Sequence, residues 1–534
     1  MKNSLAFRLF LPLTVIAGLF IITQSFDIQG YLSTGDHGRD LYAFERTLHG
    51  DIAYQDYWWV YGPLMPFYYA LMMKCCGINV LSVLAGKALL QFTSGIFIFL
   101  AINNIASPIA AMMGAIWFFL FSQDFFFTYN HIGGILCVNA IAALLMAYVR
   151  RQETGYLWAA AAAAFILSFI KVNFGLAGFM AIATATFITD RTFKTAPLPS
   201  KSLFYRTTLI YAPLVVAAGY AFLLRGLPLY ELRQCMPYAN ADQPYNTLPW
   251  TALANYWSIF IQKFLTTPID FIFGAVIITS IIRIAYMAIH RQLKDTAGKQ
   301  HIIGLVILGL YFLLNFHEYL KSGVWYRSIW TQPIALAFFF IAISLALHTT
   351  GRRLKLLVWG MIALLAVSGW RLHTNVIQQL HTSGHYISHE KIKAFVANDP
   401  GWIQTVEHTT DFLNASLKPE EQFLALPYDP IYYYLTGRKS PVPLLIFFEH
   451  INIPPQQEQK IIASLESENI NWVVASSRMN ALEPGLGRFG ITYCPQIGKY
   501  LQDNFIEVAR FGDWQNEPGW GWNHGTMILK RKMR

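Results

Sequence analysis

Five aspartates gather in the first polar stretch of the chain, directly after its first apolar segment. They are Asp27, Asp36, Asp40, Asp51 and Asp56, in a chain of which only 13% of the residues are charged. A carboxylate can serve as a general base, cap a helix or bind a metal ion. This stretch is therefore the first place to look for chemistry.

The spacing within the stretch predicts a helix from Asp36 to Leu48. On such a helix Asp36 and Asp40 lie one turn apart on the same face, with Arg39 beside them. Two interpretations stay open. Either Asp36 is a general base, with Asp40 as the runner-up, or Asp36 is the helix N-cap and Asp40 only pairs with Arg39 or Arg46.

Aromatic residues follow the carboxylates closely. Large rings with a polar edge are suited to stacking on the faces of sugars. Asp56, which lies among them, is expected to be a structural or acceptor-side companion of Asp36. The aromatic residues in question are Tyr54, Tyr57, Trp58, Trp59 and Tyr61.

The composition of the chain points to a membrane. Its 534 residues are 55% hydrophobic, and soluble domains carry about twice its charged fraction. The apolar residues come in long blocks, which predicts a polytopic α-helical membrane protein. A formal net charge of +10 does not indicate a nucleic-acid partner, because the basic residues cluster in short loops between the apolar blocks.

We expect about eleven spans, since each needs about 20 apolar residues to cross the bilayer. The segment from Pro63 to Cys76 is short for a span and is predicted to be a re-entrant or interfacial helix. The predicted spans are Leu5–Phe26, Val80–Ala101, Pro108–Phe121, Ile132–Val149, Tyr156–Ile170, Phe174–Ile188, Thr208–Leu224, Pro268–His290, Ile302–Phe316, Ile329–Leu347 and Leu354–Trp370.

Loop charge predicts the orientation. Alternation of the spans places the strongly basic loops, such as the one at Arg150-Arg151, on one side. By the positive-inside rule that side is the cytoplasm, together with the N-terminus. The carboxylate stretch and the chain after the last span then lie outside. We expect a multi-pass protein of a bacterial inner membrane with a periplasmic C-terminal domain.

The composition changes after the last span. Helices are predicted at Trp402–Leu417 and Gln456–Ser467, and strands at Phe423–Leu426, Trp472–Ala475 and Met527–Lys530. Such alternation suggests a small α/β domain. The expected organisation is a transmembrane domain at 1–371, in which 27–79 forms the first extracytoplasmic loop with its juxtamembrane helices, and a periplasmic α/β domain at 372–534.

Two motifs resemble a known enzyme class. The runs Gly35-Asp36-His37-Gly38, Gly50-Asp51-Ile52-Ala53-Tyr54-Gln55-Asp56 and Tyr61-Gly62-Pro63-Leu64 resemble the first extracytoplasmic loop of GT-C glycosyltransferases. The likeness is greatest to bacterial relatives of the dolichyl-phosphate-mannose protein mannosyltransferases and of the lipid A aminoarabinose transferase. In the tail, Pro427-Tyr428-Asp429-Pro430-Ile431-Tyr432-Tyr433-Tyr434-Leu435-Thr436-Gly437-Arg438 resembles a Tyr-Leu-x-Gly-Arg element of such enzymes. His37 stands where the family has its second acidic residue.

The resemblance implies an inverting transfer of a sugar from a polyprenyl-phosphate donor to an acceptor on the outer side of the membrane. Asp36 would act as general base. The departing phosphate needs cationic partners, for which Lys321 and Arg327 are the first candidates. Lys171 and Arg39 are further candidates for the donor phosphate. The remaining candidates for the substrate-binding or structural loop are His37, Tyr54, Asp56, Tyr61 and Glu318.

No cofactor is predicted, and a requirement for a divalent metal stays open. Neither the five cysteines nor Glu318 beside His317 show a metal-binding spacing. The expected partners are the lipid-linked sugar donor, a lipid, glycan or protein acceptor, and membrane lipids. Two other functions also stay open, namely a transporter or flippase of lipid-linked saccharides and a non-catalytic subunit of an envelope polysaccharide system.

Overall fold

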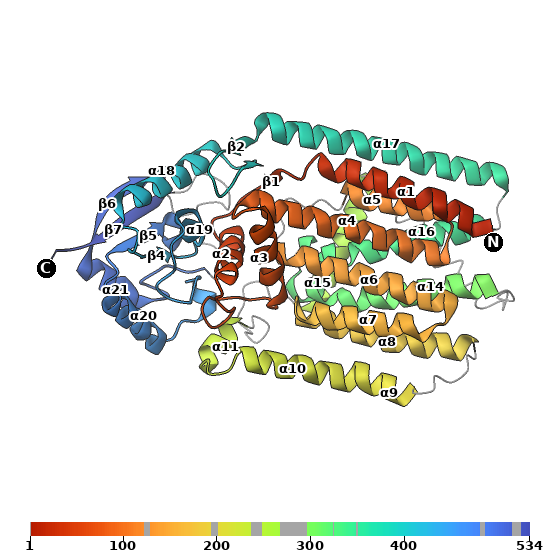
Figure 1. Cartoon of the computed structure of the whole chain (residues 1–534), viewed down its shortest axis with the longest axis horizontal. Helices are drawn as coiled ribbons and strands as arrows, with labels where there is room; N and C mark the ends of the chain where they lie inside the picture. The colour runs from red at the N-terminus through yellow and green to blue at the C-terminus, as the bar shows by residue number, and fades with distance from the viewer. Residues whose placement is uncertain are drawn as a thin grey trace.

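The computed structural model is elongated, with a bundle of long helices on one side and a mixed α/β part on the other (Figure 1). The N-terminus lies at the far end of the bundle and the C-terminus at the opposite end of the molecule. The structure describes residues 2–121, 129–193, 201–235, 248–266, 296–323, 325–348, 351–480, 486–514 and 525–533.

The bundle consists of helices that run along the long axis. Within the residues described, six helices are long and apolar enough to cross a membrane, so the protein is a multi-pass membrane protein. The helices of the bundle are α1 (Lys2–Thr23), α4 (Val80–Ile105), α5 (Pro108–Phe121), α6 (Tyr129–Arg151), α7 (Thr154–Ser168), α8 (Val172–Phe193), α9 (Lys201–Arg206), which continues through the π-helix η1 (Thr207–Tyr211) into α10 (Ala212–Leu223), α14 (Thr296–Asn315), α16 (Gln332–His348) and α17 (Arg352–Ser383).

The predicted spans agree only in part with the helices of this bundle. Pro268–His290 lies outside the described residues, and each of the other predicted spans overlaps a helix. Three of these apolar helices, Pro108–Phe121, Thr154–Ser168 and Gln332–Leu345, are shorter than a typical span. The count of eleven therefore stays a prediction.

The first polar stretch folds into helices at one end of the bundle. Helix α2 has the predicted bounds, Asp36–Leu48, and it packs on α3 (Leu64–Cys76). Gly50, with a φ of +96°, follows the C-cap residue His49, which is where a glycine ends a helix most easily. Strand β1 (Ile28–Gly30) precedes α2.

The C-terminal part contains two small sheets. One has the order β1-β3-β2, in which β1 from the first polar stretch pairs in parallel with β3 (Ala394–Val396). The other has the order β4-β5-β7-β6. The other elements of this part are β2 (His385–Ile387), α18 (Pro400–Ser416), β4 (Phe423–Leu426), α19 (Ile431–Thr436), the 3-10 helix η4 (Glu449–Ile451), α20 (Pro455–Ser467), β5 (Trp472–Ser476), the 3-10 helix η5 (Ser477–Asn480), α21 (Pro495–Asn504), β6 (Phe505–Phe511) and β7 (Thr526–Arg531). Two further helices, α11 (Leu229–Cys235) and α12 (Pro249–Thr266), lie between α10 and α14 in the chain.

The strands and helices predicted for this part are present as α18, β4, α20, β5 and β7, whereas α21 and β6 were not predicted. Strands β4 and β5 are parallel and completely buried, as expected for strands that read as continuous apolar runs. Strand β6 was missed because most of its side chains are exposed, so it shows no buried run.

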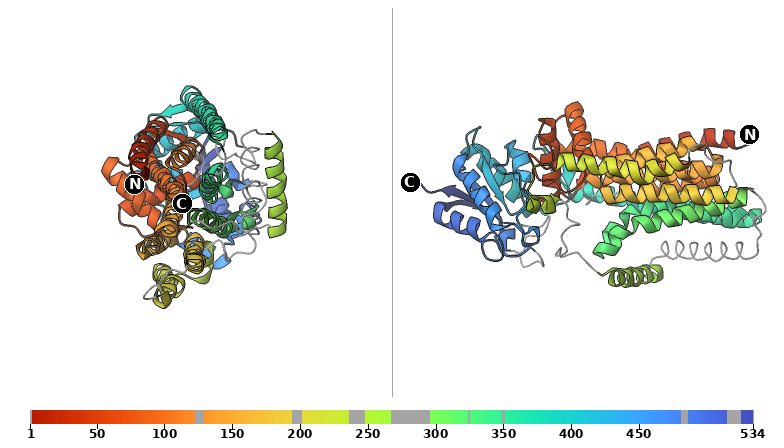
Figure 2. Two further views of the ribbon diagram at one scale, coloured as in Figure 1. Left: turned by 90° about the vertical axis from the view of Figure 1, so that its right-hand side faces the viewer. Right: turned by 90° about the horizontal axis from the view of Figure 1, so that it is seen from below.

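The C-terminal part and the first polar stretch lie at the same end of the bundle, as Figure 1 and the right-hand view of Figure 2 show. The Trp58 backbone N–H donates to Pro443 O at 2.8 Å, and the Ile431 N–H donates to Thr34 O at 3.3 Å. Gly38 faces α19 so closely that a Cβ there would collide with the Ile431 backbone. The two segments therefore form one block.

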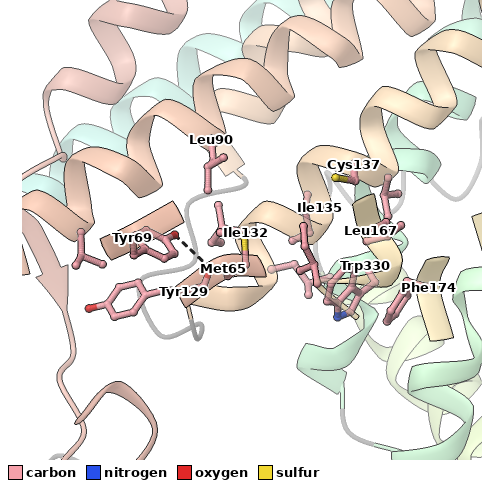
Figure 3. Close-up of a cluster of buried hydrophobic side chains, with 14 of the residues drawn as sticks. Met65, Tyr69, Leu90, Tyr129, Ile132, Ile135, Cys137, Leu167, Phe174 and Trp330 are labelled. Atoms are coloured by element: carbon pink, nitrogen blue, oxygen red, sulfur yellow. Dashed lines mark hydrogen bonds between the residues drawn. The ribbon is translucent and has the colours of Figure 1, made fainter. Parts of the chain in front are cut away.

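An aromatic core joins this block to the bundle (Figure 3). The Tyr69 hydroxyl on α3 donates to the Tyr129 carbonyl at the start of α6, at 3.2 Å. Further along, the Phe174 and Trp330 rings stack at 3.9 Å. Stacked and edge-on rings of this kind pack densely and restrict side-chain motion, so the residues next to them have fixed positions.

Candidate active site

The turn before α2 decides how its first residues point. The Ser33 N–H donates to His37 Nδ1 at 3.0 Å, and the His37 N–H donates to Ser33 Oγ at 3.1 Å. These reciprocal bonds turn the His37 ring into the protein, where it is buried. The N-cap residue is Gly35, and the side chain that accepts from the first turn of the helix is that of Ser33. The interpretation of Asp36 as the N-cap is therefore wrong.

Asp36 instead faces two polar side chains. Its Oδ1 accepts a hydrogen bond from the Tyr428 hydroxyl at 2.9 Å and one from Arg39 Nη1 at 3.2 Å. Arg39 Nη1 also donates to the Tyr428 oxygen at 3.1 Å. The Asp36 side chain keeps 40% of its surface exposed, against 3% for Arg39. Asp36 is thus oriented by its partners and still open to solvent.

Asp40 is in a different situation, because it is completely buried. Its Oδ1 accepts from Arg39 Nε at 2.9 Å and Nη2 at 2.7 Å, and its Oδ2 accepts from the Tyr129 N–H at 3.2 Å. Burial raises the Asp40 pKa to about 6, against the opposing effect of the Arg39 charge. This geometry favours Asp36 over Asp40 as the base, with Asp40 holding the Arg39 guanidinium.

Tyr61 lies against this cluster. The Arg39 guanidinium carbon is 5.1 Å from the centre of the Tyr61 ring, within range of a cation–π attraction. The Tyr54 hydroxyl donates to the Tyr61 carbonyl and fixes the loop. Tyr54, Trp58 and Trp59 are buried, whereas Tyr61 is half-buried. Of these four rings, Tyr61 has the most surface available to a sugar.

A second charged cluster lies beside the first and comes from other elements. Lys171, in the turn between α7 and α8, places Nζ 2.6 Å from Glu318 Oε1. Glu318 belongs to α15 (His317–Ser322), which follows α14. Its Oε2 accepts from Asn173 Nδ2 at 3.1 Å. Arg327, in the 3-10 helix η3 (Trp325–Trp330), places Nη1 3.6 Å from Glu318 Oε1.

Aromatic rings surround the Lys171 ammonium. Its nitrogen lies 5.2 Å from the Trp330 ring centre, 5.3 Å from that of Phe174 and 6.0 Å from that of Tyr61. Trp330 and Phe174 are the stacked pair of Figure 3. Tyr61 therefore lies within cation–π range of both Arg39 and Lys171, and it links the two clusters.

The backbone links them as well. The Gly62 N–H donates to Ile170 O at 2.9 Å, and the Leu64 N–H donates to Phe169 O at 3.0 Å. A Cβ at Gly62 would collide with the Phe169 carbonyl. Glycine is therefore needed where the loop carrying Tyr61 meets the turn carrying Lys171.

The other predicted site residues are placed less centrally. Asp56 accepts from the Ile52 N–H at 2.8 Å and so stabilises its own turn. Lys321 lies one turn after Glu318 on α15 and interacts with it electrostatically. Among the residues described, no group of three or more His, Cys, Asp or Glu side chains could hold a metal ion.

Sequence reasoning missed two residues of the site. Tyr428 is 392 positions from Asp36. It lies within the tail motif, but the resemblance of that motif gave no role to this residue. Asn173 is two residues from Lys171, and it donates to the same carboxylate as that lysine. Neither shows a spacing that marks it, because both contacts arise from the fold.

Comparisons with known proteins bear on the fold. No protein-family model and no curated protein sequence matches the chain. Among solved structures, ArnT from Cupriavidus metallidurans in the apo state aligns with a TM-score of 0.58 at 10% identity, over 96% of this chain and 97% of that one. ArnT bound to undecaprenyl phosphate aligns with a TM-score of 0.55 at 12% identity, over 97% of both chains. The predicted resemblance is thus confirmed, and over nearly its whole length the chain has the fold of a GT-C glycosyltransferase.

Proposed function

We propose that the protein transfers a sugar, with inversion, from a polyprenyl-phosphate donor to an acceptor on the periplasmic side of a bacterial inner membrane. One observation carries the proposal. Arg39, which holds the partly exposed carboxylate of Asp36, and the buried cation Lys171 both lie within cation–π range of the same half-buried ring, that of Tyr61. The fold is shared with ArnT, one structure of which holds undecaprenyl phosphate.

The chemistry needs both kinds of group. The acceptor hydroxyl loses its proton to Asp36 as its oxygen bonds to the anomeric carbon of the sugar. The bond between that carbon and the phosphate oxygen breaks, and the electron pair leaves with the polyprenyl phosphate. A positioned base contributes about 10²- to 10⁴-fold in rate, and charge stabilisation of the leaving group is often the larger effect.

The two clusters divide these tasks in the proposal. Lys171 and Arg327 hold the donor phosphate, with Lys321 nearby on α15. Arg39 is engaged by two carboxylates and the Tyr428 oxygen, so its charge serves to orient Asp36. This differs from the sequence-based hypothesis, in which Arg39 was also a phosphate ligand.

The topology fits a donor that arrives in the bilayer. Asp36 lies on α2, at the end of the bundle that also carries the C-terminal part (Figure 1). Loop charge predicts that this end is outside the cytoplasm. Nucleotide sugars are not available there, which is why a lipid-linked donor is proposed. The acceptor is a lipid, a glycan or a protein that offers a hydroxyl group.

The test is Asp36→Asn in membrane vesicles supplied with a polyprenyl-phosphate-linked labelled sugar. We expect the transfer rate to fall by about 10²- to 10⁴-fold. Asp56→Asn is the matched control, because Asp56 lies in the same stretch and only stabilises its turn. Transfer at the wild-type rate by a folded Asp36→Asn protein would exclude Asp36 as the base. Movement of the intact donor across the membrane without cleavage would favour a flippase.

A further inference from the structure

We propose that Glu318 is an internal counter-anion of the donor site, which occupies the phosphate-binding cations in the empty protein and is displaced by the lipid phosphate. In this role Glu318 weakens the binding of the spent polyprenyl phosphate and so helps it to leave. The inference rests on the proposed function and assigns a role in substrate exchange to a residue that takes no part in the bond making.

Both oxygens of Glu318 are held by groups that suit a phosphate. Oε1 faces the Lys171 ammonium at 2.6 Å and the Arg327 guanidinium at 3.6 Å, while Oε2 accepts from the Asn173 amide at 3.1 Å. Ammonium, guanidinium and amide N–H groups are the usual ligands of phosphate oxygens. The carboxylate therefore occupies a set of donors that a phosphate would use.

The carboxylate of Glu318 can replace the phosphate of the donor because the two groups carry the same charge. A sugar linked to a polyprenyl phosphate is a phosphodiester, with two equivalent oxygens that share one negative charge, as in a carboxylate. After transfer the lipid carries a phosphomonoester, with three such oxygens and a second ionisation near neutral pH. Two cations facing this product bind it more tightly than they bind the donor, unless an anion competes for them.

The proposal assigns a fixed part and a moving part to this site. Lys171 lies among the Tyr61, Phe174 and Trp330 rings, which keep its ammonium in place when the partner changes. Glu318 is buried as well, so its carboxylate must withdraw by rotation about its side-chain bonds when the phosphate binds.

The experiment measures binding of undecaprenyl phosphate to the purified full chain, in wild type and Glu318→Gln. We expect the variant to bind about tenfold more tightly, a change of about 1.4 kcal/mol, because one competing charge is removed. Undecaprenol, which lacks the phosphate, should bind equally to both. The rate should fall more under multiple-turnover conditions, where product must leave, than in a single turnover.

Glu45→Gln is the matched control. Glu45 forms another partly buried pair with a lysine, Lys391, also at 2.6 Å, and it lies outside the cluster around Tyr61. This variant loses a similar ion pair and should keep the wild-type affinity for undecaprenyl phosphate. Tighter binding in both variants would show a general loss of negative charge and overturn the inference.

A second variant covers the case in which Glu318→Gln does not fold, since it leaves Lys171 without its 2.6 Å partner. Glu318→Asp keeps the charge and retracts it by one methylene, so its affinity should lie between those of the wild type and the expected Gln variant. If the folded Glu318→Gln variant binds undecaprenyl phosphate with unchanged or weaker affinity, the inference is overturned, whereas the proposed function is not. Absence of binding in the wild type overturns the proposed function, and the inference with it.

Discussion

Two charged clusters meet at Tyr61, and they are built in opposite ways. In the cluster on α2, Asp36, Arg39 and Asp40 come from one helical turn, and a single guanidinium faces two carboxylates. In the cluster around Lys171, the partners come from separate elements, and two cations face the single carboxylate of Glu318. The first cluster carries an excess of negative charge and the second an excess of positive charge.

The difference matters for the chemistry proposed. A base works best where negative charge is retained beside the acceptor, and a leaving phosphate is stabilised where positive charge is retained. If the two excess charges were mixed in one cluster, they would cancel. Tyr61 keeps them apart, because its ring occupies the space near both Arg39 and Lys171.

The largest effect is expected when the α2 cluster loses its cation, in Arg39→Gln. Asp40 would then be a buried carboxylate without its partner, which typically costs about 3–5 kcal/mol of stability. We expect a clear fall in the melting temperature of the purified protein together with loss of transfer. Arg39→Lys, which keeps the charge and loses the two-pronged contact, should be intermediate. A wild-type melting temperature for Arg39→Gln would contradict this account of Asp40.

The α2 cluster was predictable from sequence because it is local. Side chains three and four positions apart on a helix are neighbours whatever the rest of the fold does, which brings Asp36 beside Arg39 and Asp40. The helix Asp36–Leu48 formed with the predicted bounds. The N-cap interpretation failed because His37 and Ser33 bond each other across the turn. Ser33 and His37 are four positions apart, a pair that does not match the S/T-x-x-E/Q pattern of a capping box.

The Lys171 cluster was predictable only as a set of candidates. Apolar periodicity located α7 and α8, which flank Lys171, and α14, which precedes Glu318. The contact between these two residues nevertheless spans 147 positions. Which ends of the helices meet is decided by packing, here by Gly62 against the Phe169 carbonyl and by the stacked Phe174 and Trp330 rings. Sequence alone contains no spacing that reports such a contact.

A substitution at the junction tests whether the two clusters must be held together. Gly62→Ala places a methyl group against the Phe169 carbonyl and should push the Tyr61 loop away from Lys171. Overpacking of this kind costs about 1–3 kcal/mol, and misplacement by about 1 Å can reduce the rate of catalysis about 100-fold. Transfer and melting temperature should both fall.

Gly360→Ala is the control for this substitution. A Cβ at Gly360, on α17, meets nothing within 4 Å, so the added methyl group should leave transfer unchanged. If Gly62→Ala transferred sugar at the wild-type rate, contact between the two clusters would not be needed for the reaction, and the role given to Tyr61 would be wrong.

The smallest expected effect is one of pH, and it sharpens the difference between Asp36 and Asp40. Burial raises the Asp40 pKa to about 6, so acidification from pH 7 to 5 protonates this carboxyl in the folded protein. The Arg39 guanidinium then faces one negative charge, that of Asp36, instead of two, and it moves toward Asp36. Since about one tenth of Asp40 stays ionised one unit below its pKa, transfer should fall about tenfold at pH 5.

The sign of the stability change separates this effect from acid unfolding. An ordinary aspartate in the unfolded chain loses its proton near pH 4, so between that pH and 6 the folded protein holds the Asp40 proton and the unfolded chain does not. Acidification through this range therefore stabilises the fold at Asp40 while transfer declines. Asp429, whose pKa burial also raises to about 6, is the competing explanation. The fall in transfer between pH 7 and pH 5 should persist in Asp429→Asn and should be absent in Asp40→Asn. The opposite result would assign this fall to Asp429 in the C-terminal part.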